Sequence, residues 1–534
     1  MGDKAASADY SESALIEPPS TEPEVSAVGD PGDGIESQVV SGARWVVLLR
    51  VGTMATLWIT SIALARLLVP SQYGLAGMAM IVVSVLTVFQ ESGLHAALIQ
   101  RRDRIQEAVD AATAYAPFAG VLFMAMTFAA APLAGLFFRH HEVTQLVRAL
   151  SIVFLLRSIS QVPIAVLQKE FRFRSFALVM LTGSLVQMSV AIGLAAEGAG
   201  AWSAIGGLIA LEAWCALLMW RVCPMRAHPR RASLTELRGL LRYGRNMVGA
   251  NINIMLFSYV DLAVVGRFLG APALGAYTIG YQSGKQAVAN VTYASNQLIF
   301  PAYSKLQDDL ERFRRAYLRS IRFITTLSVP VSFGLVVVSN EFIRVVYGER
   351  WTPAVPVVAI MSLMGLVLSV TATMGEVLKA TNRPGLFFRI SLLETVLAVA
   401  SILVFYRFGI AAVAACVASA VTITGGVVTW QISRILRLRP ADWIGVLRSP
   451  ILAGLALVGG IVLTKAGVGA LTKTATAPIL LLLVVEGAVI YLGSLRVIEA
   501  DRLREFLREI EKLTSLRRLL RGLRFGAGDA SPTG

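Results

Sequence analysis

The first long apolar stretch, residues 45–66, reads WVVLLRVGTMATLWITSIALAR and carries only two charged side chains. Its length matches the roughly 20 apolar residues that a helix needs to cross the hydrocarbon core of a bilayer. Over the whole chain of 534 residues, 55% are apolar and 16% are charged, whereas a soluble domain carries about a quarter charged residues. We therefore expect a protein that spans a membrane many times.

Similar stretches continue up to Val497 and predict an all-α fold with about fourteen transmembrane helices. The connections between them are short, so no large soluble domain is expected. The predicted helices are 45–66, 74–99, 111–138, 148–167, 176–197, 201–222, 244–267, 273–300, 320–346, 354–378, 386–406, 410–432, 450–466 and 476–496.

The net charge of +15 is distributed as membrane topology predicts. With both termini in the cytoplasm, 35 of the 49 Lys and Arg residues fall in cytoplasmic connections or the C-terminal tail, and nine fall in outer connections. Positive residues collect on the cytoplasmic side of membrane proteins. The charge pattern therefore predicts an even number of spans with both termini cytoplasmic, and no nucleic-acid partner is expected.

Three matches between the two halves of the chain indicate an internal duplication. They lie at equivalent points of the helix count, at offsets of 201, 211 and 209 residues. We therefore predict two six-helix lobes, related by a parallel pseudo-two-fold axis along the membrane normal, with substrate between them and two extra C-terminal helices. The matched segments are Arg66–Gly74 with Arg267–Gly275, Val166–Lys169 with Val377–Ala380, and Gly200 with Gly409.

The two ends of the chain differ from the apolar middle. The N-terminal end mixes Asp, Glu, Ser, Pro and Gly without the apolar core of a signal peptide, which predicts a disordered tail. The C-terminal end interleaves Leu and Phe with Arg and predicts an amphipathic helix on the anionic inner leaflet, with a solvated tail as the alternative. The predicted segments are 1–43 (acidic cytoplasmic tail), 44–223 (N-terminal lobe), 224–243 (basic cytoplasmic linker), 244–434 (C-terminal lobe), 435–497 (helices 13 and 14) and 498–534 (basic cytoplasmic tail).

Lys285 lies near the middle of a predicted span, where a charged side chain is costly and usually faces a cavity or a partner. Its ammonium group could hold a diphosphate as a point charge. The alternative is a structural ion pair with Asp261 or Glu394. At the angular step of an α-helix, the polar residues on the same face are Tyr281, Thr292 and Asn296.

Three more polar residues are candidates for lining a cavity. Arg50 lies two turns into the first span and Arg157 lies nearer the middle of the fourth, and an arginine suits bidentate phosphate recognition. The alternatives are that Arg50 extends to the inner interface and that Arg157 joins neighbouring helices. Asn253 lies on the same face of the seventh span as Asn246.

Carboxylates inside the predicted spans are candidates for binding a coupling proton or sodium ion, because burial favours the protonated or paired form. The three candidates are Glu91, Asp261 and Glu394, and for each the alternative is a structural carboxylate with a partner. Further intramembrane carboxylates that the sequence does not rank are Glu212, Glu376 and Glu486.

Enzymatic chemistry has little support in the sequence. The three cysteines form no C-x-x-C pair, the four histidines form no metal-ligand pattern, and no P-loop is present. We therefore expect a transporter with no cofactor, no metal site and no catalytic residue.

Five strings of residues occur in order between about residues 40 and 440. They are Gly42–Trp45, Leu64–Gly74, Glu91–Gln100, Leu167–Arg174, and Asp261–Gly270 followed by Leu274–Tyr277. In this set the chain resembles the polysaccharide-transporter branch of the multidrug/oligosaccharidyl-lipid/polysaccharide (MOP) superfamily, in particular oligosaccharide flippases of the Wzx/WzxC kind. The resemblance implies a two-lobed, V-shaped carrier in the cytoplasmic membrane.

What such a carrier would move also comes from the resemblance. It implies transfer of undecaprenyl-diphosphate-linked oligosaccharide to the outer leaflet, for lipopolysaccharide, other surface polysaccharide or exopolysaccharide biosynthesis. Glycosyltransferases and a polymerase of the same pathway are the partners it suggests.

Two other functions stay open at this point. A cation-coupled multidrug exporter of the same superfamily would need an acidic or aromatic cavity, whereas the central candidates here are cationic. A membrane-embedded polysaccharide polymerase or ligase would need a sizeable outer loop, whereas the predicted outer connections are short.

Overall fold

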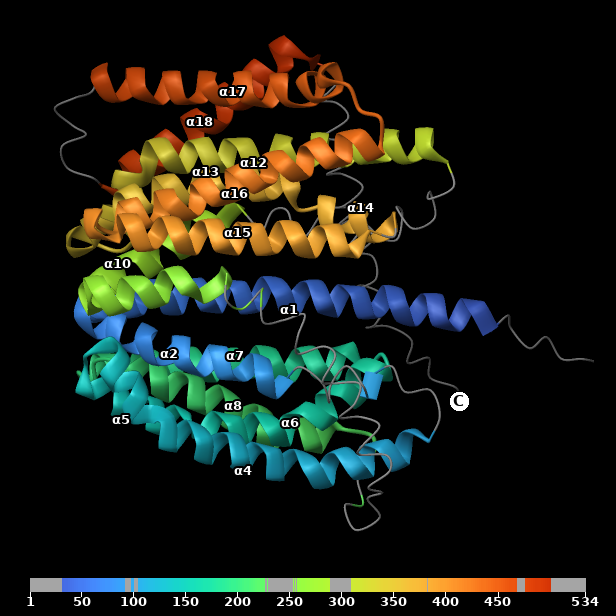
Figure 1. Ribbon diagram of the computed structural model, residues 1–534, viewed down its shortest axis with the longest axis vertical. Coiled ribbons are helices and arrows are strands. Elements are labelled where there is room, and N and C mark those ends of the chain that lie inside the picture. Colours follow the sequence, from blue (N-terminus) through green and yellow to red (C-terminus); the bar gives the residue numbers. More distant parts are fainter. Residues whose placement is uncertain are drawn as a thin grey trace, which may run out of the picture.

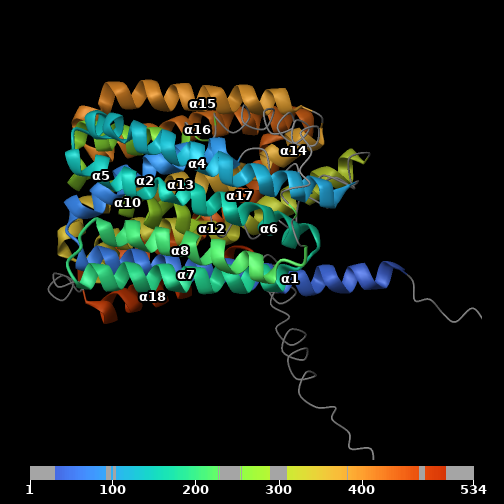
Figure 2. The same ribbon diagram turned by 90° about the horizontal axis from the view of Figure 1, so that it is seen from below.

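The computed structural model describes residues 31–91, 98–99, 104–225, 228, 253, 255, 257–288, 309–381, 383–467 and 476–500. Every regular element in these residues is a helix, so the predicted all-α class is confirmed. Twelve helical segments of the described part are long and apolar enough to cross a bilayer. The helices run side by side in both views (Figures 1 and 2).

The N-terminal lobe contains the first six predicted spans, and α5 and α6 together form one of them. It is drawn from blue to green in Figure 1. Its helices are α1 (Pro31–Leu67), α2 (Pro70–Glu91), α4 (Ile105–Phe138), α5 (His141–Leu150), α6 (Ile152–Lys169), α7 (Phe173–Ala196) and α8 (Trp202–Val222).

In the described part of the C-terminal lobe, the first continuous helical stretch before η2 is residues 257–264. The predicted spans 244–267 and 273–300 are described only in part, so the total of fourteen spans stays a prediction. The later elements are η2 (Val265–Leu269), α10 (Ala271–Tyr281), η3 (Gln282–Gln286), α12 (Leu310–Val346), η4 (Glu349–Ala354), α13 (Val355–Thr371), α14 (Met374–Ala380), α15 (Pro384–Phe405), η5 (Tyr406–Phe408) and α16 (Ile410–Ile435).

Two further helices, α17 (Pro440–Gly467) and α18 (Ala477–Ile498), pack on α12 and on each other. In Figure 1 they lie on the side of the C-terminal lobe away from the N-terminal lobe. Their position agrees with the prediction that they are additions to the duplicated core.

Local sequence explains where several helices start. Pro70, Pro384 and Pro440 are the first residues of α2, α15 and α17, where a proline costs no helical hydrogen bond. Gly200 and Gly409 precede α8 and α16 with φ of 58° and 93°, a left-handed conformation that suits glycine. The two glycines are the matched pair of the predicted duplication.

Some helices extend beyond the predicted spans. α12 begins at Leu310 rather than at 320, and α4 begins at Ile105 rather than at 111. α1 begins at Pro31, inside the segment 1–43 that the sequence predicts to be a tail. Apolarity marks the part of a helix that lies in the membrane, while a helix can continue into water with polar residues.

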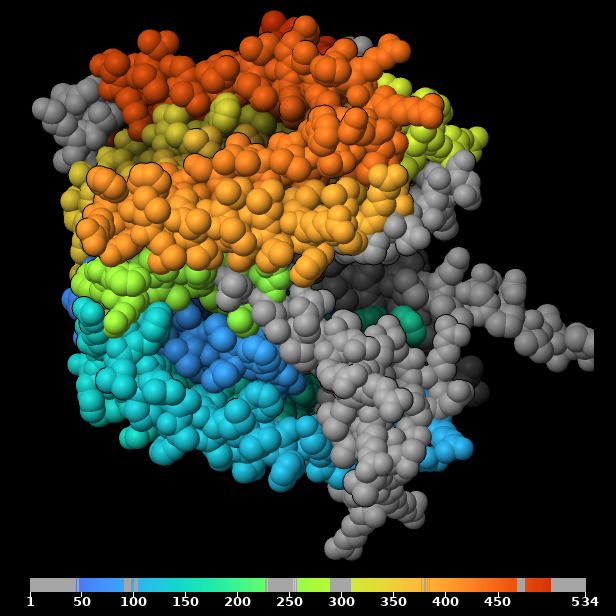
Figure 3. Space-filling view, viewed as in Figure 1, coloured from blue at the N-terminus to red at the C-terminus, as the bar shows by residue number. Residues whose placement is uncertain are grey.

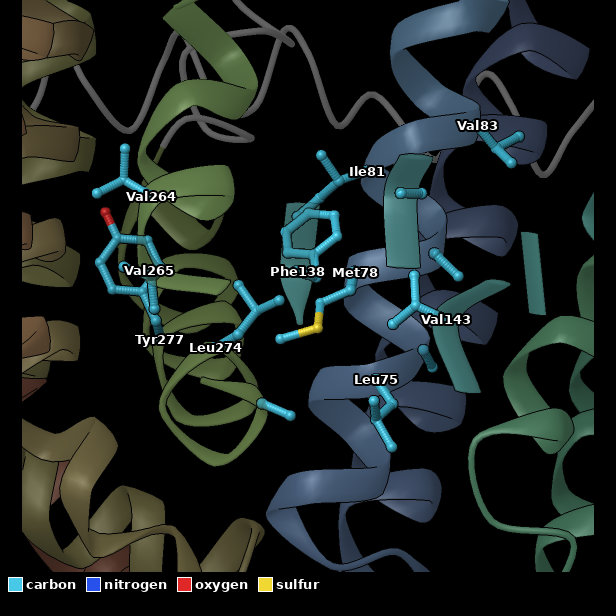
Figure 4. Close-up of a cluster of buried hydrophobic side chains, with 14 of the residues drawn as sticks. Leu75, Met78, Ile81, Val83, Phe138, Val143, Val264, Val265, Leu274 and Tyr277 are labelled. Carbon is cyan, nitrogen blue, oxygen red and sulfur yellow. The ribbon is translucent and has the colours of Figure 1, made fainter. Parts of the chain in front are cut away.

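The two lobes share apolar cores at one end of the bundle, where α1 ends and α2 begins; we call this the joined end. Figure 4 shows Met78 of α2 pointing toward Leu274 of α10, with Phe138 of α4 beside Met78, and Leu75 belongs to the same cluster. A second mixed cluster places Ala65 against Trp351. In Figure 3 the described surfaces of the two lobes meet at this end, on the left.

At the opposite end the apolar clusters of the described residues belong to one lobe or the other. One contains Leu98, Val109 and Val166 of the N-terminal lobe. Another contains Tyr317 and Ile432 of the C-terminal lobe and its extension. The lobes are therefore packed together at the joined end and have separate cores at the other.

Candidate functional site

Lys285 lies in η3, a π-helical turn that directly continues α10. Its ammonium group donates a hydrogen bond to the hydroxyl of Tyr281, one turn earlier. The nitrogen also lies 4.5 Å from the ring centroid of Tyr281 and 5.9 Å from that of Phe257. Aromatic faces stabilise a cation at this distance, and among the described residues no carboxylate forms an ion pair with this half-buried lysine.

Asp261 lies on the neighbouring helix and is 2% exposed. It accepts hydrogen bonds of 2.8 Å from the hydroxyl of Tyr277 and from the backbone N–H of Leu262. The rings of Tyr277 and Tyr281 lie 6.4 Å apart. Two tyrosines thus stand between Asp261 and Lys285, which remain within electrostatic range of each other. Asp261 and Lys285 therefore form no direct ion pair, since each is hydrogen-bonded to a tyrosine instead.

Glu394 and Asn253 extend this group toward α15. Asn253 donates to Ser391 at 2.7 Å and accepts from Thr395 at 3.1 Å. Glu394 lies between Ser391 and Thr395 in the sequence, and it is half-buried. It interacts with Thr424 of α16 and lies within electrostatic range of Lys285. Both ends of the Asn253 amide are engaged by α15, which favours a structural role for this residue.

Arg157 has its partner inside the N-terminal lobe. Its Nε atom lies 3.0 Å from the carboxylate of Glu212 and its Nη1 atom lies 3.1 Å from the hydroxyl of Thr87. The side chain of Glu212 is 9% exposed and that of Arg157 is 23% exposed. The pair joins α6, α8 and α2, as the helix-joining alternative predicted, and Glu212 neutralises the arginine. Sequence spacing could not reveal Glu212 as the partner because the two residues lie on different helices.

The remaining predicted residues fall into two groups. Arg50 is on α1 and its side chain is exposed. Thr292, Asn296 and the side chain of Glu91 lie outside the described residues.

The Lys285 cluster, which we define as Lys285, Tyr281, Tyr277, Asp261 and Glu394, lies beside the contact between the lobes. Gln282, in the same π-helical turn as Lys285, accepts a hydrogen bond of 3.2 Å from Ser61 of α1. Ser283 donates to Tyr347 at 3.1 Å. π-Helical turns recur at functional sites, and this one places a cation next to the lobe interface. The sequence places Ser61 near the helical face of Arg50, but it gives no signal that pairs Ser61 with Gln282.

A second cationic group lies on α12, near its N-terminal end. There a pocket of about 640 Å³ is lined along one helical face. The described lining residues are Arg312, Arg315, Ala316, Leu318, Arg319 and Arg322. This end of α12 belongs to a connection that the charge pattern predicts to be cytoplasmic.

Comparison with known proteins gives a family and several relatives. Residues 63–356 match the family model described as "Polysaccharide biosynthesis protein". The teichuronic acid biosynthesis protein TuaB of Bacillus subtilis is 28% identical over 370 residues, which cover 66% of this chain and 74% of TuaB.

Two other relatives cover similar shares. The lipopolysaccharide biosynthesis protein WzxC of Escherichia coli is 24% identical over 69% of this chain and 75% of its own length. The succinoglycan biosynthesis transport protein ExoT of Rhizobium meliloti is 27% identical over 67% of this chain and 72% of its own length.

Solved structures show the same fold. The lipid II flippase MurJ in an inward closed conformation aligns with a TM-score of 0.68 and 15% identity, over 85% of this chain and 99% of MurJ. An inward-facing multidrug resistance MATE transporter of the MOP superfamily aligns with a TM-score of 0.56 and 14% identity, over 72% of this chain and 95% of its own. The family model spans more than half of the 534 residues, and the chain belongs to the polysaccharide biosynthesis protein family that this model describes.

Proposed function

We propose that this protein is a flippase that moves oligosaccharide units linked to a polyprenyl diphosphate across the cytoplasmic membrane, for surface or exopolysaccharide assembly. The observation that carries the proposal is a cationic side chain, Lys285, beside the contact between the lobes of a transporter fold. Its relatives are named for three different polysaccharides, and one of them is named a transport protein. A carrier of lipid-linked precursors suits all three pathways.

Transport would follow from a change in how the lobes meet. The diphosphate head would enter from the end where the lobes have separate cores, attracted first by the arginines of α12. The polyprenyl tail would stay in lipid while the head reaches Lys285. Tyr281, Thr292 and Asn296 are the polar residues proposed to line the path, whereas Asn253 is proposed to hold α15 in place.

The three cationic candidates are not equivalent. The ammonium of Lys285 contacts aromatic rings and forms no ion pair with a carboxylate of the described residues, so a phosphate could approach it without displacing any of these carboxylates. Arg157 would have to leave Glu212 before it could bind a phosphate. Arg50 is exposed on α1 and remains a candidate for contact with the head group. We therefore assign the main contact to Lys285.

Asp261 and Glu394 are the proposed coupling carboxylates, because both lie within electrostatic range of Lys285. A diphosphate bound to Lys285 would weaken the attraction of the lysine for these carboxylates. The carboxylates would then bind a cation more strongly. Glu91 remains a candidate on the basis of the sequence.

The orientation proposed here has both termini and the basic pocket of α12 in the cytoplasm, and the joined end outside. It rests on the excess of Lys and Arg in connections on one side of the membrane. The proposed partners are glycosyltransferases and a polymerase of the same pathway.

The multidrug exporter is the second candidate. The likeness to a MATE transporter concerns the fold, which both kinds of transporter share. A lysine at the lobe interface repels cationic drugs, and this disfavours the exporter. A polymerase or ligase is disfavoured by the short described connection between α7 and α8 and by the three-residue η5 between α15 and α16.

The test is complementation of a strain lacking this gene with Lys285→Gln and Lys285→Arg variants. We expect the glutamine variant to lose surface polysaccharide and to accumulate the lipid-linked precursor, while the arginine variant keeps part of the activity because it keeps the charge. Membrane abundance of each variant is the control. Normal polysaccharide with Lys285→Gln at normal abundance would contradict the assigned role.

A further inference from the structure

Two arginines at the joined end each reach from one lobe to the other. Arg66, near the end of α1, donates from Nε to the carbonyl oxygen of Val346 at 2.9 Å and from Nη2 to that of Val345. Arg267, in η2 of the C-terminal lobe, donates from Nη1 to the carbonyl oxygen of Leu136 at 3.3 Å. The accepting carbonyls lie in the last turns of α12 and α4.

These carbonyls need partners from outside their own helices. The last four carbonyls of a helix have no intrahelical donor, and a cation at this end also interacts favourably with the helix dipole. In α4 the carbonyl of Gly135 is satisfied by the N–H of His140, and in α12 that of Ile343 is satisfied by the N–H of Gly348. The arginine of the opposite lobe donates to other carbonyls of the same last turns, those of Val345 and Val346 in α12 and that of Leu136 in α4.

The two contacts are related by the internal duplication. Arg66 and Arg267 differ by 201 positions, the offset of the repeated segment that contains them, and Leu136 and Val345 differ by 209, the offset of the Gly200 and Gly409 pair. Both helices also end at residues in the left-handed region, Arg139 at φ 60° and Gly348 at φ 105°. Each arginine therefore binds the third span of the other lobe, as in an interface with two-fold symmetry.

Glycines bring the lobes together between the two arginine contacts. A Cβ atom on Gly74 of α2 would lie 1.8 Å from the carbonyl oxygen of Ala271, and one on Gly275 of α10 would lie 2.4 Å from that of Pro70. The two contacts are equivalent in the duplication, because Gly74 and Gly275, and likewise Pro70 and Ala271, are 201 positions apart. Because backbone touches backbone here, the lobes cannot part at this end by adjusting side chains alone.

We propose that Arg66 and Arg267 are gating residues which form a two-fold latch, and that both must release the opposite lobe before the lobes separate at the joined end. Because the two contacts are related by the pseudo-two-fold, a movement that separates the lobes at the joined end stretches both contacts at once. Loss of both arginines should therefore favour opening more than the sum of the single losses. The inference rests on the lobe movement in the proposed function and is independent of the cargo.

Distances between spin labels on the full chain in lipid nanodiscs test the latch. The labels are placed on Glu197→Cys, between α7 and α8, and on Arg407→Cys, in η5; both residues are exposed at the joined end. The three native cysteines are replaced by alanine. We expect one short distance in the parent protein and a larger long-distance population in the variant with Arg66→Gln and Arg267→Gln, with smaller increases in each single variant.

The control for lost charge is Arg148→Gln. The guanidinium carbon of Arg148 lies 5.1 Å from the ring centroid of Phe128, in the same lobe. The distance between the spin labels should therefore not change in this variant. Two glycine variants test the same contact by adding a methyl group at a crowded and at an uncrowded position of α2. Gly74→Ala should increase the long-distance population, whereas Gly77→Ala, on the same helix with its nearest neighbour at 3.5 Å, should not.

A double arginine variant with the parental melting temperature and the parental distance distribution would overturn the latch. If that variant does not fold, equal distributions for Gly74→Ala and Gly77→Ala would overturn it instead. Because the measurement contains no cargo, labels that separate as expected in a protein that flips no lipid-linked oligosaccharide would support the latch and contradict the proposed function.

Discussion

Arg157 and Glu212 show how a charge inside a membrane bundle acquires a partner. The arginine is the conspicuous residue in the sequence, and its position in a span predicts either a cavity or a partner. Which of the two holds depends on the helix that faces it, and that is a property of packing rather than of spacing. In the structure the carboxylate comes from α8, 55 residues further along the chain.

Glu212→Gln should destabilise the N-terminal lobe. The substitution leaves the largely buried guanidinium of Arg157 without its counter-charge, and removal of one partner from a buried pair costs about 3 kcal/mol or more. Thermal unfolding in mild detergent measures the loss. The double variant with Arg157→Gln should recover part of the stability because no uncompensated charge remains. A Glu212→Gln variant as stable as the parent, or a double variant no more stable than Glu212→Gln, would contradict this account of the pair.

Tyr277→Phe should also destabilise the protein. Asp261 would lose the donor at 2.8 Å and keep the N–H of Leu262, and a buried group left short of a hydrogen bond costs roughly 1–3 kcal/mol. The free energy of unfolding is the quantity to compare. Tyr281→Phe is the matched control, since it removes the acceptor of Lys285 and leaves the bonds of Asp261 intact. A Tyr277→Phe protein as stable as the parent would contradict this account of Asp261.

At the level of helices, the sequence located the membrane-embedded parts and missed details of helix geometry. The i to i+4 spacing correctly placed Tyr281 beside Lys285. The same reasoning assigned Thr292 and Asn296 to that face by assuming an uninterrupted α-helix. The π-helical turn η3 changes the angular step per residue between Gln282 and Gln286, which that reasoning did not take into account. Composition gives no signal for such a turn. Thr292 and Asn296 lie outside the described residues, so their placement stays a prediction.

The close packing of α10 and η3 against α13 depends on glycine. A Cβ on Gly284 would lie 2.7 Å from the backbone carbonyl of Val358, which cannot move aside as a side chain can. Gly284→Ala should therefore lower the melting temperature and displace Lys285. Gly459→Ala, in α17, is the control because nothing lies within 4 Å of the added methyl group, and alanine in a helix should instead stabilise by about 0.5–1 kcal/mol. The same melting temperature for both variants would contradict the packing.

For the whole molecule, apolar stretches, alternating charge and three repeated segments predicted an all-helical, two-lobed protein. They did not predict which end of the bundle holds the lobes together. That depends on side chains from both lobes, such as Leu75 and Leu274, that meet only after folding. The repeated Arg and Gly positions were visible in the sequence, but their contacts across the two-fold axis were not.

The most direct test of the central claim is lipid flipping by the purified protein in vesicles. The probe is a polyprenyl-diphosphate-linked oligosaccharide with a fluorescent label on the sugar, and dithionite added outside reduces the label only in the outer leaflet. We predict that vesicles with the protein lose almost all fluorescence, because inner-leaflet probe is carried outward, and that Lys285→Gln vesicles keep the inner-leaflet fraction. Wild-type vesicles that keep this fraction as protein-free vesicles do would contradict the account.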